Sequence, residues 1–170
     1  MSIGLLILRL VVGLSLAAHG AQKLFSWFGG YGIAGTGQFL EQLGFRPGRL
    51  YAAQAGIGEV AGGLFLAAGF LTPAAAAAVV AVMLVAAVSV HLKSGFFAHD
   101  GGHEYTLVLG AAALALAFTG PGALSLDRAL GIAWSGEAWG LAALAAGLIG
   151  GTVPLLARKT APAATAQTAA

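Results

Sequence analysis

The chain of 170 residues contains no cysteine and very few charged residues. The absence of cysteine excludes disulfide relays, thiolate catalysis, and iron–sulfur or Cys-ligated metal centres formed by this sequence. Charged residues make up only 8 %, whereas a soluble domain carries roughly 25 %. Hydrophobic residues make up 59 %, and the mean hydropathy is +0.90. The composition therefore predicts an integral membrane protein.

The basic isoelectric point, about 9.3, does not indicate nucleic-acid binding. The formal net charge is only +2, and the eight Lys and Arg residues are scattered singly along the chain. Binding to phosphates needs a clustered basic surface. We therefore expect no nucleic-acid partner, and the expected surroundings are a lipid bilayer.

Five apolar segments predict five membrane-spanning helices, since about 20 apolar residues cross a bilayer core. The segments lie at residues 3–25, 50–71, 73–92, 104–119 and 138–156. The tight turn before Pro73 predicts an antiparallel hairpin, and the run GPG at 120–122 ends the fourth segment. The expected fold is all-α: an antiparallel four-helix transmembrane bundle over 1–130 and an additional transmembrane helix within 131–157.

The links between these segments differ in character. In the glycine-rich stretch 28–48, Phe39, Leu40 and Leu43 fall at helical spacing, which predicts a short interfacial helix. The stretch 121–137 is expected to include one helical turn. Residues 158–170 end in an Ala/Thr/Pro-rich sequence and are expected to form a disordered cytoplasmic tail.

Basic residues favour one orientation in the membrane. Six of them fall on the side reached after the first, third and fifth segments: Lys23, Arg46, Arg49, Lys93, Arg158 and Lys159. The positive-inside rule makes that side cytoplasmic. We expect a bacterial cytoplasmic (inner) membrane protein whose N-terminus is outside and whose C-terminus is cytoplasmic.

Small residues predict where the helices pack. Gly58 with Gly62, and Gly147 with Gly151, form small-xxx-small pairs that allow close backbone approach. We interpret them as packing surfaces within the bundle. A homo-oligomer interface is the alternative, because such motifs serve both uses.

Ionisable residues inside the first segment mark its buried face. At 100° per residue, Arg9, His19 and Lys23 lie within an arc of about 80°. This stripe must face the other helices, because charge in lipid is costly. Glu59 falls between Arg9 and His19 in depth, so it is expected to be the counter-ion of Arg9 or a hydrogen-bond partner of His19.

Further polar groups are predicted to meet in the cytoplasmic half of the bundle. The expected cluster comprises His19, Lys23, Gln54, Glu59, His91, Glu104 and Tyr105. Such a cluster under an apolar roof is a plausible headgroup site. Simpler roles stay open: a structural ion pair for Arg9, an interfacial anchor for Lys23, a helix cap for Glu104 and a backbone hydrogen bond for His91.

Two cofactor alternatives have weaker support. The loop sequence HDGGHE at 99–104 offers imidazoles and carboxylates to a metal. Its two glycines break any regular helical face, so no metal site is predicted. A haem between His19 and His91 would need matched depth and a wide cleft.

The ordered set of motifs resembles the DoxX family of small bacterial membrane proteins. The motifs are RLVVG at 9–13, HGAQKLF at 19–25, Glu59, GFLT at 69–72, His91, GF at 95–96, EY at 104–105 and GPGALSLD at 120–127. The resemblance covers residues 5–130 and implies a four-helix membrane bundle. Some members of the family are subunits of a thiosulfate:quinone oxidoreductase, and others are linked to oxidative or quinone stress.

The expected function is that of a redox-associated membrane subunit binding a quinone or similar small apolar molecule. His19 and Glu59 are the candidate catalytic residues. Ligand-binding candidates are Arg9, Lys23, Gln54, His91, Glu104 and Tyr105. A redox partner protein is expected, since the sequence contains no nucleotide-binding loop. Whether the chain is itself an enzyme stays open. The alternative is a non-catalytic membrane anchor for a soluble redox enzyme, or a small-molecule permease.

Overall fold

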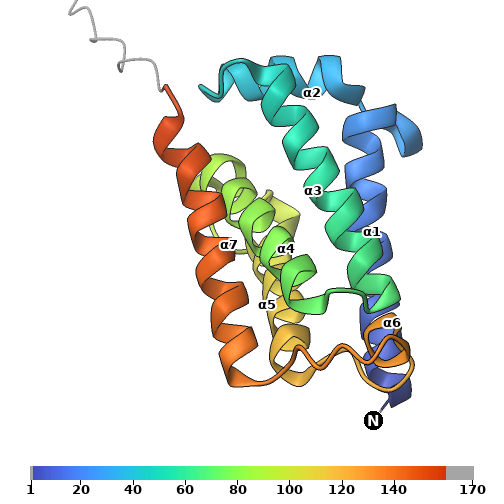
Figure 1. Ribbon diagram of the computed structural model, residues 1–170. Coiled ribbons are helices and arrows are strands. Elements are labelled where there is room, and N and C mark those ends of the chain that lie inside the picture. Colours follow the sequence, from blue (N-terminus) through green and yellow to red (C-terminus); the bar gives the residue numbers. More distant parts are fainter. Residues whose placement is uncertain (1, 160–170) are drawn as a thin grey trace, which may run out of the picture.

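The computed structural model describes residues 2–159, and every regular element among them is a helix (Figure 1). The long elements are α1 (Ser2–Phe25), α3 (Gly48–Ala68), α4 (Thr72–Ala86), α5 (Glu104–Thr119) and α7 (Glu137–Ala157). The short ones are α2 (Gly32–Gln42) and α6 (Leu126–Ala129). A π-helix, Ala87–His91, and a 3₁₀ turn, Leu92–Ser94, continue α4, so that this span runs from Thr72 to Ser94.

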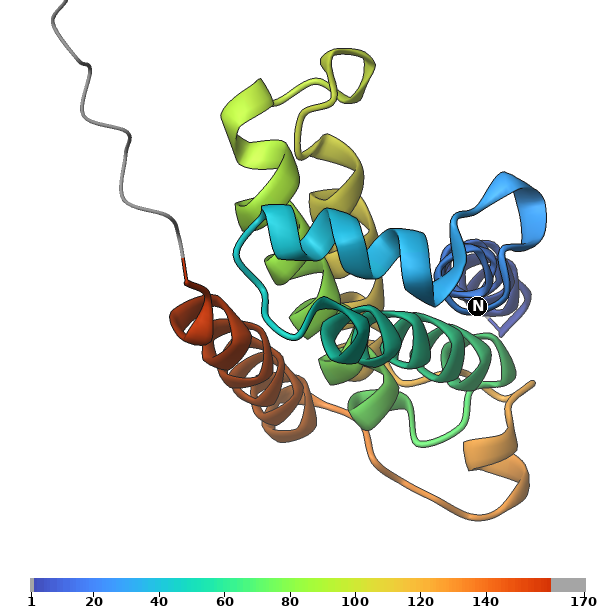
Figure 2. The ribbon, with the colours of Figure 1, turned by 90° about the horizontal axis from the view of Figure 1, so that it is seen from above.

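Four helices are long and apolar enough to cross a membrane, and α5 is a shorter apolar helix beside them. This result confirms the predicted all-α membrane architecture. Helix α2 lies across one end of the bundle, where the interfacial helix was predicted, and α6 supplies the predicted turn at the other end (Figures 1 and 2). We call these two ends the α2 end and the α6 end.

Helices α1 and α3 pack antiparallel with their backbones in close contact. A Cβ on Gly20 would lie 2.6 Å from the carbonyl oxygen of Gly56, and a Cβ on Gly63 would lie 2.5 Å from that of Gly13. Both positions leave room only for hydrogen. The two glycine pairs therefore fix the register of α1 against α3, with Gly20 beside Gly56 and Gly13 beside Gly63.

The remaining helices complete the bundle around α4, which packs against α3, α5 and α7. The core combines apolar side chains from α1, α3, α4, α5 and α7, among them Leu16, Leu66, Val79 and Leu116. Gly147 and Gly151 of α7 face α4, and Gly58 and Gly62 of α3 face it from the other side. These four glycines thus pack within the chain, as predicted.

The start of the predicted C-terminal tail has a defined position. The backbone N–H of Lys159 donates to the carbonyl of Gly44 at 2.9 Å, and the guanidinium of Arg158 lies over the ring of Phe45 at 5.8 Å. The end of α7 is thereby attached to the loop between α2 and α3. The rest of the predicted tail, residues 160–170, lies outside the described residues.

Candidate functional site

A cavity of about 320 Å³ lies between α2, α3 and the continuation of α4, near the α2 end. Its walls are mostly apolar, with Phe39, Phe45 and Val82 among the lining side chains. Polar side chains also line it: Lys23, Thr36, Tyr51, Gln54, Glu59, Ser89 and His91. Ligand pockets typically measure roughly 300–1,000 Å³ and combine apolar walls with a few polar groups. The cavity is thus small but of the expected kind.

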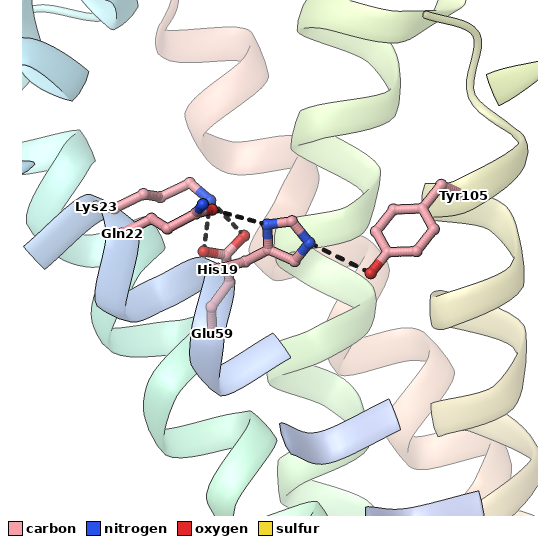
Figure 3. A network of polar contacts seen from close by, with 5 residues as sticks. All are labelled: His19, Gln22, Lys23, Glu59 and Tyr105. Carbon is pink, nitrogen blue, oxygen red and sulfur yellow. Dashed lines mark hydrogen bonds and ion pairs between the residues drawn. The ribbon is translucent and has the colours of Figure 1, made fainter. Parts of the chain in front are cut away.

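Lys23 and Glu59 form an ion pair (Figure 3). Both residues line the cavity. The ammonium nitrogen of Lys23 donates to both carboxylate oxygens of Glu59, at 2.8 Å to Oε1 and 2.6 Å to Oε2. The Glu59 side chain is only 4 % exposed, and that of Lys23 is 29 % exposed. The pair therefore holds two charges at a largely dry site beside a cavity.

The register of α1 against α3 explains why Lys23 reaches Glu59. With Gly20 beside Gly56, Glu59 lies level with Ala17, about 9 Å along the axis from Lys23. Side chains on a helix lean toward its N-terminus, and the long lysine stem covers the remaining distance. Lys23 is therefore more than the interfacial anchor that its position at the end of α1 suggests.

Arg9 does not pair with Glu59, so the predicted role of Glu59 as its counter-ion is wrong. The register of α1 against α3 explains why. Arg9 lies near the α6 end, level with Ala67, about 12 Å along the axis from Glu59. Its Nη1 and Nη2 donate to the carbonyls of Pro121 and Leu124 in the loop after α5. Arg9 is 1 % exposed, so it is a buried clamp at the far end of the molecule and lies outside the cavity lining.

His19 contacts α5 and makes no hydrogen bond with Glu59. Its Nδ1 lies 3.2 Å from Oε1 of Gln22, and its Nε2 lies 3.2 Å from the hydroxyl of Tyr105 (Figure 3). Since the amide oxygen can only accept, Nδ1 carries the proton, and in the neutral ring Nε2 accepts from Tyr105. The second expectation for Glu59, a hydrogen bond with His19, is therefore wrong in this structure. His19 and Tyr105 are not among the residues that line the cavity.

His91 and Glu104 hold the loop that joins the continuation of α4 to α5. Nδ1 of His91 donates to the carbonyl of Gly101 at 2.8 Å, and a carboxylate oxygen of Glu104 accepts from the backbone N–H of Ala98 at 2.9 Å. His91 also lines the cavity, whereas Glu104 does not. Four members of the predicted cluster thus meet at the cavity (Lys23, Gln54, Glu59 and His91), and three do not (His19, Glu104 and Tyr105).

The loop histidines form no metal centre among the described residues, where no three His, Asp or Glu side chains are grouped to hold an ion. His99 pairs with its neighbour Asp100 at 3.1 Å, and both are exposed. His103 donates from Nδ1 to the carbonyl of Gly95 at 2.8 Å. The polar atoms of this loop therefore stabilise its own shape.

Asp127 and Ser89 are among the buried polar residues that sequence reasoning missed. Asp127 is 1 % exposed and accepts hydrogen bonds from the backbone of Leu71 and from the backbone and hydroxyl of Thr72. Ser89 is 7 % exposed, lines the cavity, and has no partner for its hydroxyl oxygen. One signal was available for Ser89, because it is the single polar residue between Pro73 and Val90.

The fold and the site define a helical integral membrane protein with a small, mostly apolar cavity and a buried ion pair. The sequence model of the DoxX family matches residues 4–92, from the start of α1 into the last turn of the third span. The chain belongs to the DoxX family. No curated protein and no solved structure matches it.

Proposed function

We propose that the protein is a redox-associated membrane subunit that binds a quinone, or a similar small apolar molecule, in the cavity beside α3. The observation that carries the proposal is the position of the Lys23–Glu59 pair on the wall of this cavity. A quinone ring is apolar on its faces and bears carbonyl oxygens at its edge. An apolar cavity with a few well-placed hydrogen-bond donors suits such a molecule.

The Lys23 ammonium is the group best suited to contact the ligand's polar edge. An ammonium has three N–H donors, and the hydrogen bonds of Lys23 among the described residues are both with Glu59. One donor therefore remains for a carbonyl oxygen in the cavity. Glu59 holds the ammonium in place, and the pair can deliver a proton to that oxygen when a partner protein supplies electrons.

His19 is a candidate catalytic residue from the sequence, but it does not line the cavity. It also makes no hydrogen bond with Glu59. One of its hydrogen bonds is with Gln22 on α1, and the other is with Tyr105 on α5. We assign direct ligand contact to Lys23, the positioning of its ammonium to Glu59, and to His19 no contact with the ligand.

Quinone extraction and binding test the proposal. The protein is purified in mild detergent, extracted with organic solvent and analysed for quinones by mass spectrometry, and a short-chain alkyl-1,4-benzoquinone is then titrated against it. We expect bound quinone in the wild type and at least tenfold weaker binding in Glu59→Gln, because Lys23 loses the ion pair that holds its ammonium on the cavity wall. Glu137→Gln, exposed at the start of α7, is the matched control and should bind as the wild type does.

Either of two outcomes would contradict the proposal. One is a wild type that carries no quinone after gentle purification and binds none on titration. The other is equal binding by the wild type and the folded Glu59→Gln variant. Either result would mean that the Lys23–Glu59 pair serves only to stabilise the fold.

A non-catalytic anchor for a soluble redox enzyme is the second candidate, and the loop between the third span and α5 favours it. Residues 95–104 are largely exposed, yet the loop is braced by hydrogen bonds from His103 to Gly95 and from Ala98 to Glu104. A preformed surface of this kind can dock a partner at low entropic cost. If alanine substitutions in this loop disrupt a complex with a soluble redox enzyme and leave the quinone content unchanged, they would support the anchor function rather than the quinone site. The permease alternative has no comparable observation behind it.

A further inference from the structure

Ser89 lies on the cavity wall, and its buried hydroxyl has no hydrogen-bond partner. The residue as a whole is 7 % exposed. Burying a hydroxyl without a partner costs free energy, so folded proteins rarely leave one in this state. The unpaired hydroxyl therefore calls for a specific explanation.

The backbone around Ser89 also fails to provide a hydrogen-bond partner for its hydroxyl. A serine inside an apolar helix usually donates to the carbonyl one turn earlier, but Ser89 does not. It lies within the π-helix Ala87–His91, where the regular α-helical pattern of α4 has ended. Single π-turns of this kind are frequent at functional sites, where they re-aim side chains. Here the segment sets Ser89 and His91 on the cavity wall.

Lys23 and Ser89 are polar residues of the cavity wall that come from different helices. Lys23 comes from α1, Ser89 comes from the continuation of α4, and α3 packs against both α1 and α4. Glu59 already accepts two hydrogen bonds from Lys23, which removes it as the obvious partner for the serine. The partner that remains is a molecule inside the cavity.

We propose that Ser89 donates a hydrogen bond to an acceptor oxygen of the bound molecule, while Lys23 donates to a second acceptor oxygen. The ligand class is then a neutral ring that carries two carbonyl oxygens, as distinct from a plain hydrocarbon or a lipid chain. This inference rests on the proposed function, because it assumes a ligand in this cavity. It adds a specificity-determining residue and a requirement on the ligand's chemistry.

The test compares two probes on the full chain in mild detergent. One probe is a short-chain alkyl-1,4-benzoquinone, and the other is the alkylbenzene with the same chain. Ser89→Ala should weaken quinone binding roughly three- to tenfold, which is the range for one neutral hydrogen bond. It should leave alkylbenzene binding unchanged. Ser15→Ala, on α1 outside the cavity lining, is the matched serine control and should leave both unchanged.

Thermal unfolding of the ligand-free protein separates this role from a structural one. Because Oγ of Ser89 has no partner to lose, Ser89→Ala should unfold at the same temperature as the wild type or at a higher one. A lower unfolding temperature would assign the hydroxyl to the fold and overturn the inference.

The outcomes distinguish this inference from the proposed function. If the wild type binds quinone and Ser89→Ala binds it equally well, the role of Ser89 is wrong and the quinone site stands. If the wild type binds the alkylbenzene as tightly as the quinone, the requirement for acceptor oxygens is wrong. If the wild type binds no quinone, the proposed function fails, and the inference fails with it.

Discussion

Arg9 is a buried charge that the fold satisfies mainly with backbone carbonyls. Its guanidinium donates to Pro121 and Leu124, and Asp127 lies close enough for its charge to act on it. Gly69, the residue that ends α3, has φ 63°, and any Cβ there would collide with the guanidinium. Arg9 thus locks the α3–α4 turn and the loop after α5 together at the α6 end.

We expect Arg9→Lys to destabilise the fold without weakening ligand binding. A lysine places one point charge where arginine offers a planar fork, so it cannot bridge both carbonyls. The loss of one charge-assisted hydrogen bond should cost about 2 kcal/mol in the free energy of unfolding. Chemical denaturation in detergent measures this cost. Arg128→Lys, exposed at the same end, is the control and should be neutral. Weaker quinone binding in a stable Arg9→Lys variant would contradict the separation of the two sites.

The sequence predicted the buried stripe on α1 correctly but paired its residues wrongly. The helical period places Arg9, His19 and Lys23 on one face, and all three do contact other segments of the bundle: the loop after α5, α5 and α3. Their partners depend on the sliding position of α3 against α1, which the hydropathy pattern does not contain. The estimated depth of Glu59, between Arg9 and His19, agrees with the register, which sets it level with Ala17. The partner differs because the long Lys23 side chain leans toward the N-terminus of α1 and reaches Glu59 from the end of that helix.

At the scale of helices, the α1–α3 contact controls the site. Without a hydrophobic drive in lipid, helices associate through close packing, for which small residues are needed. The pairs Gly20–Gly56 and Gly13–Gly63 supply it and sit at seven-residue spacing on both helices. Since Lys23 follows Gly20 by one turn, the same contact holds the ion pair together.

We therefore expect Gly20→Ala to impair both stability and ligand binding. Its Cβ would meet the backbone of Gly56 and Val60, which cannot move aside as a flexible side chain does. The strain should cost about 1–3 kcal/mol in the free energy of unfolding and shift Lys23 away from Glu59. Gly4→Ala is the control on the same helix, because a Cβ there meets nothing within 4 Å. Equal thermal stability of the two variants would show that the α1–α3 contact is looser than described.

The sequence predicted where each helix begins and ends better than it predicted the position of the cavity. Apolar runs, Pro73 and the glycines at 120 and 122 mark where helices begin and end, and the observed bounds of all five long helices agree closely with the sequence prediction. The cavity depends on how α2 crosses the bundle end and on the π-helix at Ala87–His91. Neither feature leaves a periodic signal in the sequence, so the roles of Ser89 and of the cavity wall emerged only from the structure.

For the whole molecule, the two ends differ in charge. The α2 end carries six basic residues: Lys23, Arg46, Arg49, Lys93, Arg158 and Lys159. At the α6 end, Arg128 is exposed and Arg9 is buried. Tryptophans mark both ends, with Trp27 before α2 and the stacked pair Trp134 and Trp139 near the start of α7, whose ring centroids are 4.9 Å apart. Such aromatic belts are typical of the two membrane–water interfaces.

This asymmetry predicts that the α2 end, and the cavity with it, faces the cytoplasm in bacterial cells. The natural absence of cysteine makes the test direct, since any labelled thiol is an introduced one. Ala129→Cys on α6 and Ser94→Cys after α4 place one exposed thiol at each end. A membrane-impermeant maleimide should label Ala129→Cys in intact spheroplasts and Ser94→Cys only after the membrane is opened. The reverse pattern would place the cavity on the outer side, where a cytoplasmic electron donor could not dock beside it.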